Sequence, residues 1–314
     1  GRYMFSHGST YNNVPLPLGE RTLGDYLRPL GIRVGLTGKT HFAPDYEGMK
    51  RLGIDPRSES GLLVSQCGFE PWERDDGLHP DQSVDPDLAY NRYLRNEGYL
   101  GENPWHSEAN SAEGPDGETL SGWQMRNVRL PARVSREHSE TAYMTNRAMH
   151  WIDKLGEQSW CLHLSYIKPH WPYIAPAPYH SLYATDHILK ANRDYEEKED
   201  PHPVVAAFMR HEESINFSRD EVRETVIPAY MGLVTEIDDH IGRLMDFLKK
   251  KELLEKTLIV FTSDHGDYLG DFNMLLKGAL PFNAVTNVPF IWADPQCENV
   301  QISNDLASTI DISA

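Results

Sequence analysis

The segment VFTSDHGDYLGD, residues 260–271, places an aspartate and a histidine directly after a run of apolar residues. Asp264 and His265 would point to opposite faces of a continuing strand, but a turn permitted by Gly266 aims both at one point. A carboxylate with an imidazole suits a divalent cation such as Ca²⁺, Mn²⁺, Mg²⁺ or Zn²⁺. Asp264 could equally cap the following turn, so the spacing leaves both metal binding and capping open.

Two further polar loops carry residues that could serve a tetrahedral anion. Lys39 and His41, in the loop GKTHF, combine a fixed positive charge with a proton-transfer group. His170 lies between two prolines in KPHWP and could protonate a leaving group. Lys277 follows the acidic segment and could add a second cation. For each of them an ordinary loop or surface position is the alternative.

These loops follow predicted strands. Periodicity predicts helices and apolar strands in alternation, which indicates an α/β fold with a mostly parallel sheet and helices on both faces. Ligands bind at the carboxyl ends of the strands in such sheets, so the three loops should converge on one edge. The predicted helices are 21–31, 135–156 and 230–254, and the predicted strands are 32–38, 160–167, 257–263 and 288–292.

Residues 43–130 interrupt this pattern with a stretch rich in Gly, Pro, Asp, Glu and aromatic residues. We interpret it as an insertion that forms a rim or lid of the site. Trp72, Trp105 and Trp123 within it are either apolar walls of a binding site or a small core of the insertion itself.

The composition excludes some classes of protein. The net charge of −17 over 314 residues argues against nonspecific nucleic-acid binding. No apolar run approaches the roughly 20 residues of a membrane span. Cys67, Cys161 and Cys297 are too far apart for a zinc signature and are odd in number for a disulfide framework, so they do not indicate the compartment. The oligomeric state cannot be predicted.

Several segments together resemble the sulfatase family of the alkaline phosphatase superfamily: TGKTHF, KPHWPYIAP, YMGLVTEIDDHIGRL and the run from VFTSDHGDYLGD to FIW. The sequences of these segments are similar to those of phosphonate monoester hydrolases, and GKTHF is also similar to the corresponding segment of choline-sulfatases. The resemblance implies a single alkaline phosphatase-like catalytic domain over residues 1–314.

The resemblance also implies roles for individual residues. Asp264 and His265 would be ligands of one divalent ion, with Ca²⁺ preferred and Mn²⁺ or Zn²⁺ as alternatives. Lys39 would contact the sulfate or phosphonate oxygens, and His41 would hydrogen-bond the nucleophile. His170 and Lys277 would face the leaving-group oxygen, which makes them both catalytic and substrate-binding.

The nucleophile that the resemblance implies is a formylglycine made from Cys or Ser in a C/S-x-P-x-R motif. Thr-Gly-Arg-Tyr follows that motif in the family, and this sequence opens with GRYMFSHG. At the other end NDLASTIDISA starts a helical pattern and stops within it. We therefore expect a domain incomplete at both ends, with the nucleophile and two acidic metal ligands upstream of residue 1 and no activity in the fragment alone.

The function expected for the parent is hydrolysis of a small-molecule or saccharide sulfate ester. A phosphonate monoester or phosphodiester hydrolase on the same scaffold is the alternative, because a diester carries the same single charge as a sulfate monoester. A non-catalytic relative is the third hypothesis, favoured slightly by Asp271-Phe272 where relatives often have Asp-His.

Overall fold

The computed structural model describes residues 2–12, 14–77, 79, 87–194, 196–278, 280–297 and 299–313. The chain forms two compact units, each assembled from separate segments. The first comprises Gly1–Trp105, Glu137–Ile167 and Ser308–Ala314, and the second comprises His106–Arg136 and Lys168–Ala307.

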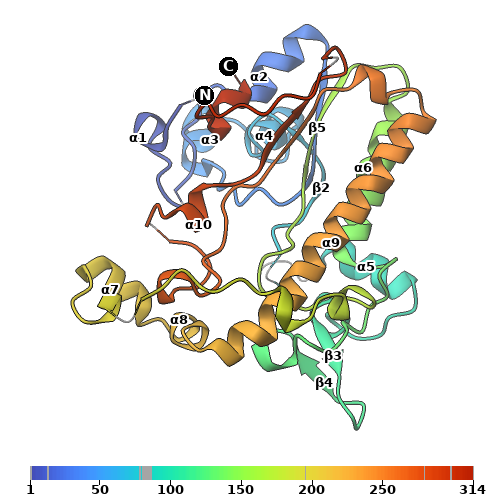
Figure 1. Cartoon of the computed structure of the whole chain (residues 1–314). Coiled ribbons are helices and arrows are strands. Elements are labelled where there is room, and N and C mark those ends of the chain that lie inside the picture. The colour runs from blue at the N-terminus through green and yellow to red at the C-terminus, as the bar shows by residue number, and fades with distance from the viewer. Residues whose placement is uncertain are drawn as a thin grey trace. The chain divides into compact units, whose positions relative to one another are not determined.

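A parallel three-stranded sheet organises the first unit (Figure 1). Its order is β2-β1-β5, with β1 Arg33–Gly38 pairing in parallel with both β2 Glu70–Arg74 and β5 Trp160–Ser165. The central strand β1 is buried from its second residue onward, as its apolar sequence requires. The predicted α/β fold with a parallel sheet flanked by helices is confirmed.

Helix α6 Glu140–Leu155 packs on this sheet close to its predicted position. Ser139 caps its start by accepting a hydrogen bond from the N–H of Ala142, and Gly156 ends it. Gly35 of β1 lets the Trp151 ring lie directly on the strand, since a Cβ there would come within 2.4 Å of the ring. The other α-helices of this unit are α1 Met4–His7, α2 Leu23–Leu27, α3 Tyr46–Leu52, α4 Glu59–Val64 and α5 Ala89–Asn96.

Strand β2 was not predicted, because its sequence EPWER shows neither an apolar run nor a clear alternation. Its charged side chains instead pair with neighbouring elements. Glu73 accepts hydrogen bonds from Arg147 at 2.8 Å and from the Tyr143 hydroxyl at 3.0 Å, both on α6. The range 43–130 therefore contributes a strand to the sheet; its residues 78 and 80–86 lie outside the described residues, and its role as a rim or lid stays a prediction.

Helix α9 Asp220–Lys250 is the longest element of the second unit and begins ten residues before its predicted start. The sequence misled here because Pro228 normally ends a helix: it lacks the N–H that would bond the Glu224 carbonyl. That carbonyl accepts a hydrogen bond from Arg129 Nη2 at 3.2 Å instead. With the freed carbonyl satisfied, the helix continues through the proline.

The core of the second unit forms along α9. Gly232 allows the close approach of the Tyr179 backbone, because a Cβ there would lie 2.1 Å from the Tyr179 oxygen. The buried members of this core are Val128, Tyr173, Ala175, Tyr179, Phe217, Val226, Ala229, Leu233 and Leu275. The other α-helices of the unit are α7 Pro203–Met209, α8 Glu212–Phe217 and α10 Asn283–Thr286.

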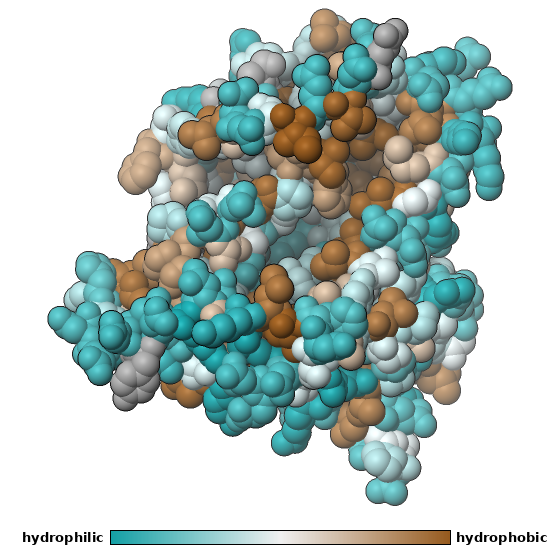
Figure 2. Space-filling view, in the orientation of Figure 1, coloured by the Kyte–Doolittle hydropathy of each residue, from teal (hydrophilic) through white to brown (hydrophobic). Residues whose placement is uncertain are grey.

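Strands β6 Ile259–Thr262 and β7 Phe290–Ala293 lie at their predicted positions but pair antiparallel with each other, a departure from the parallel pattern. A second antiparallel pair joins β3 Ser111–Glu113 to β4 Thr119–Ser121. Brown, hydrophobic side chains gather over β6 and β7 in Figure 2, and Ile291 and Trp292 are 56% and 49% exposed. Among the described residues, no helix is long and apolar enough to cross a membrane.

Candidate functional site

Two of the predicted site residues meet in the second unit. Lys277 Nζ lies 3.2 Å from His170 Nε2 although the residues are 107 positions apart in sequence. His170 Nδ1 lies 2.7 Å from the carbonyl oxygen of Trp171, to which an Nδ1–H can donate. This contact favours a neutral imidazole whose Nε2 lone pair faces the lysine ammonium. The ammonium of Lys277 can therefore donate a hydrogen bond to His170 Nε2.

Asp267 stabilises the loop that runs from Asp264 and His265 to Lys277 by accepting hydrogen bonds within it. Its Oδ1 accepts hydrogen bonds from the N–H of Leu269 at 3.0 Å and of Leu276 at 2.9 Å. Its Oδ2 accepts a hydrogen bond from the hydroxyl of fully buried Tyr173 at 2.8 Å. One carboxylate thus ties the residue before Lys277 to the segment that carries His170.

Burial sets the electrostatics of this tie. It raises the pKa of Asp267, and the hydrogen bonds from Tyr173, Leu269 and Leu276 oppose that rise by stabilising the carboxylate. The pKa of Tyr173 lies well above its ordinary value, because burial and the neighbouring carboxylate both disfavour the phenolate. Tyr173 therefore stays a hydrogen-bond donor to Asp267.

Asp264 and His265 lie together at the end of β6. His265 Nδ1 is 2.7 Å from the Gly266 carbonyl, and His265 Nε2 is 3.5 Å from Asp264 Oδ2. Gly266 is required for this turn, because a Cβ there would lie 2.0 Å from the Ala284 oxygen. Asp264 caps no helix: within the described residues its carboxylate accepts from the neighbouring Ser263 hydroxyl and the N–H of His265.

This donor set fits two ligands of a divalent cation. With Nδ1 donating to a backbone carbonyl, Nε2 of His265 keeps the lone pair that a metal requires. The Asp264 side chain is 72% exposed, so its oxygens are open to an ion. The described part of the chain contains no group of three His, Cys, Asp or Glu that could hold a metal, so these two residues alone do not complete a coordination shell.

Lys39 and His41 belong to the first unit, directly after β1. Gly38 at φ 99° turns the chain there, and a Cβ at this position would lie 1.8 Å from the Ser165 oxygen of β5. Lys39 is only 9% exposed and forms no ion pair with a described carboxylate. A nearly buried ammonium without a counter-ion in the described chain is suited to an anionic ligand.

The structure thus unites His170 with Lys277, and Asp264 with His265, each within the second unit. Lys39 and His41 form their own loop in the first unit. The convergence of all three loops on one edge stays a prediction.

Cys67 and Cys161 are poor candidates for the nucleophile. Burial raises the pKa of the Cys67 thiol to about 12 and also raises the pKa of Cys161. The reactive form of cysteine is the thiolate, so both side chains are unreactive at neutral pH.

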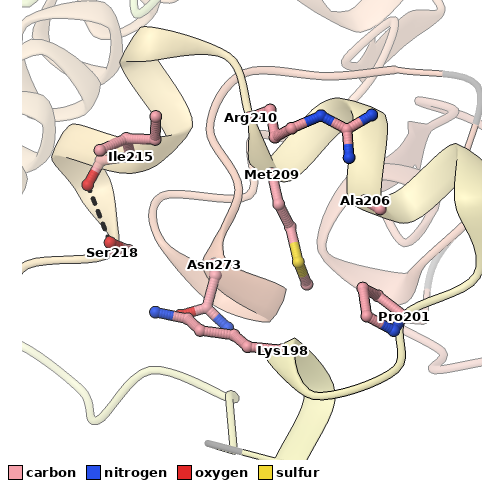
Figure 3. Close-up of a pocket in the computed structure, with 8 residues that line it drawn as sticks. All are labelled: Lys198, Pro201, Ala206, Met209, Arg210, Ile215, Ser218 and Asn273. Atoms are coloured by element: carbon pink, nitrogen blue, oxygen red, sulfur yellow. Dashed lines mark hydrogen bonds between the residues drawn. The ribbon is translucent and has the colours of Figure 1, made fainter.

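A pocket of about 410 Å³ in the second unit contains none of the predicted site residues (Figure 3). Figure 3 shows Met209 pointing from the end of α7 into it. Lys198 and Arg210 line it, and Glu197 and Glu199 on either side of Lys198 offset part of their positive charge. The remaining lining residues are Pro201, Ala206, Ile215, Ser218 and Asn273.

Comparison with known proteins decides the family. The family model described as Sulfatase matches residues 1–314. The chain belongs to the sulfatase family. Its relatives and structural neighbours belong to the alkaline phosphatase superfamily, as the wording of the loops predicts.

Curated relatives of this member of the sulfatase family carry the names of different activities. It is 29% identical to the multifunctional alkaline phosphatase superfamily protein PehA of Trinickia caryophylli, over 94% of this chain and 56% of that protein. It is 25% identical to the choline-sulfatase of Rhizobium meliloti, over 87% of this chain and 47% of that protein. The chain spans about half the length of the curated relatives it matches.

Solved structures show the same fold. The phosphonate monoester hydrolase SpPMH from Silicibacter pomeroyi matches with a TM-score of 0.77 and 26% identity, over 95% of this chain and 57% of that one. The phosphonate monoester hydrolase of Agrobacterium radiobacter matches with a TM-score of 0.72 and 23% identity, over 93% and 56%. The second likeness supports the fold alone.

Sequence reasoning on this sulfatase missed two carboxylates that organise the loops, Asp76 and Asp267. A signal was present, because both follow a strand within a run of acidic residues. Of the three tryptophans weighed as walls of the site, Trp105 is 1% exposed and belongs to the core. Trp123 packs edge-to-face on Trp171, the residue after His170, with 4.8 Å between the ring centroids.

Proposed function

We propose that the full-length sulfatase carrying this chain hydrolyses sulfate esters of small molecules or saccharides. The observation that carries the proposal is the contact of Lys277 Nζ with His170 Nε2 in a chain of this family. A lysine and a histidine at hydrogen-bond distance can deliver a proton to a departing alkoxide and stabilise its developing charge. Both residues would be catalytic and would contact the substrate.

Lys39 and His41 would act on the sulfate itself. Lys39, nearly buried and without a described carboxylate partner, would neutralise the single negative charge of a sulfate monoester. His41 is exposed in the same loop and would hydrogen-bond the nucleophile and assist breakdown of the covalent intermediate. This role is supported by the loop position directly after a parallel strand.

Sulfatases in general use a metal ion and a formylglycine. We propose that Asp264 and His265 hold one divalent ion, with Ca²⁺ preferred and Mn²⁺ or Zn²⁺ as alternatives. When bound, the ion would polarise the ester oxygens, and a formylglycine from a segment upstream of residue 1 would supply the nucleophile. Metal analysis and peptide mass spectrometry of the full-length protein test both statements.

We also propose that residues 1–314 belong to one catalytic domain whose stretch 43–130 contributes a rim to the site. The Trp123–Trp171 pair supports an apolar wall next to His170 for the alcohol part of the ester.

Hydrolysis of a phosphonate monoester or a phosphodiester is the second candidate. It is favoured by the named activity of the structural neighbour with TM-score 0.77 and by the multifunctional name of PehA. Both substrate classes carry one negative charge, so the same lysines would serve either.

The test is the ratio of kcat/KM for 4-nitrophenyl sulfate to kcat/KM for 4-nitrophenyl phenylphosphonate, measured on the full-length protein. We expect the sulfate to be preferred, and the double variant His170→Ala/Lys277→Ala to lose about 10²-fold or more in kcat/KM. The surface double variant His187→Ala/Lys190→Ala is the matched control and should retain activity.

A preference for the phosphonate would favour the second candidate. Normal turnover by the His170/Lys277 variant would refute the assigned roles. A protein that turns over neither ester while binding sulfate would favour a non-catalytic relative.

A further inference from the structure

The loop that carries Lys39 and His41 is held at its backbone by one carboxylate. Asp76 follows β2 by two residues, and its Oδ1 accepts hydrogen bonds from the N–H of Thr40 at 2.9 Å and of His41 at 3.1 Å. Two successive N–H groups that point at one oxygen form a small anion-binding concavity. Asp76 occupies it, so these two donors of the loop are satisfied within the chain.

Arg74 holds Asp76 in turn. Its Nε and Nη2 donate to Asp76 Oδ2 at 3.0 and 2.5 Å, and Nη2 also donates to the Phe42 carbonyl at 2.9 Å. The guanidinium therefore connects the carboxylate to the far end of the same loop. The two side chains are only 23% and 24% exposed, so water competes weakly for these charge-assisted bonds.

The conformation of the loop explains why such a clamp is needed. His41 has φ 52°, in the left-handed region that is unfavourable for a residue with a Cβ. Such a conformation persists only where the surroundings hold it, and it is common at functional sites. Burial raises the pKa of Asp76, but hydrogen bonds from Arg74, Thr40 and His41 outweigh burial, so the net pKa is lowered and the group is a carboxylate at neutral pH.

We propose that Asp76, held in place by Arg74, is a positioning residue. It sets the geometry with which Lys39 and His41 face the sulfate or phosphonate group of the substrate. The inference rests on the proposed function of those two residues. Because Asp76 already occupies the backbone N–H groups of Thr40 and His41, these groups do not bind the substrate. In this loop the Lys39 side chain must therefore neutralise the negative charge of the substrate.

The first experiment measures the clamp without using activity. Hydrogen–deuterium exchange of the full-length protein is compared between wild type, Asp76→Ala and the control Glu70→Gln. Glu70 pairs with Arg33 at 2.5 Å at the opposite end of the same two strands. We expect exchange at Thr40 and His41 to accelerate about tenfold or more in Asp76→Ala and to stay unchanged in the control. Unchanged exchange in Asp76→Ala would overturn the inference.

The second experiment measures positioning. With 4-nitrophenyl sulfate, kcat/KM per folded molecule should fall about 10²-fold in Asp76→Ala, mainly in kcat. Asp76→Asn should be intermediate, because one oxygen can still accept from the loop while its amide faces the guanidinium. A purely structural role would reduce the folded fraction and leave kcat per folded molecule intact.

Faster exchange with unchanged kcat/KM would therefore overturn the proposed positioning. A wild-type protein inactive on both esters would refute the proposed function instead, and the exchange result alone would then decide whether the clamp exists.

Discussion

Replacing Asp267 is the sharpest test of how the second unit holds its candidate site. Asp267→Ala removes the acceptor of three hydrogen bonds at 2.8 to 3.0 Å. The Tyr173 hydroxyl is then buried without a partner, which costs about 1–3 kcal/mol, and two backbone N–H groups lose a charged acceptor. Leu269 and Leu276 are not fully buried, so water can satisfy part of what their N–H groups lose, and we expect a total of about 3 kcal/mol.

Asp267→Asn separates the hydrogen-bond pattern from the charge. The asparagine oxygen can accept from Leu269 and Leu276 as Oδ1 does now, and its amide can donate to the Tyr173 hydroxyl oxygen. We expect a loss of about 1 kcal/mol. Glu255→Ala is the control, since the exposed side chain of this residue before β6 should cost less than about 1 kcal/mol.

Urea unfolding followed by circular dichroism measures all three variants, and kcat/KM with 4-nitrophenyl sulfate measures the site. Asp267→Ala should lower both stability and activity, because Lys277 loses the tie that places it next to His170. An alanine variant within about 1 kcal/mol of wild type, or an asparagine variant as damaging as alanine, would refute the reasoning.

Three further predictions follow from named contacts. Arg129→Ala should cost about 1 kcal/mol and accelerate amide exchange in α9, whereas Arg129→Lys should cost less; no change in exchange would contradict the role given to this donor. Burial and the positive charge of Arg243 lower the pKa of His240 to about 4, although the negative charge of Asp239 opposes this shift. The folded state resists protonation of His240, so the free energy of unfolding should fall by about 3 kcal/mol as the pH drops from above 6.5 towards 4. In urea titrations, His240→Gln should flatten this dependence on pH. Asp264→Asn should lower the divalent metal bound per full-length molecule, and equal metal content by plasma mass spectrometry would argue against its role as a ligand.

The sequence alone identified the elements whose signals are local. The strand at 32–38 and the helix at 140–155 were predictable because apolar periodicity and a following glycine are read over a few residues. The sequence also indicated Lys39, His170 and Lys277, because each lies in a polar loop whose sequence resembles that of the sulfatase family. The contact of Lys277 with His170 was implied only by that resemblance.

Tertiary structure decided the features that depend on partners distant in sequence. Strand β2 forms because its charges pair with α6, and α9 passes Pro228 because Arg129, far away in sequence, satisfies the freed carbonyl. The antiparallel pairing of β6 with β7 likewise depends on which strand edges meet. The sequence shows Asp76 and Asp267 as acidic residues that follow a strand, but it does not show what they contact. Their carboxylates accept hydrogen bonds from backbone N–H groups up to 36 residues away in sequence. A hydrogen bond across such a separation leaves no periodic pattern in the chain.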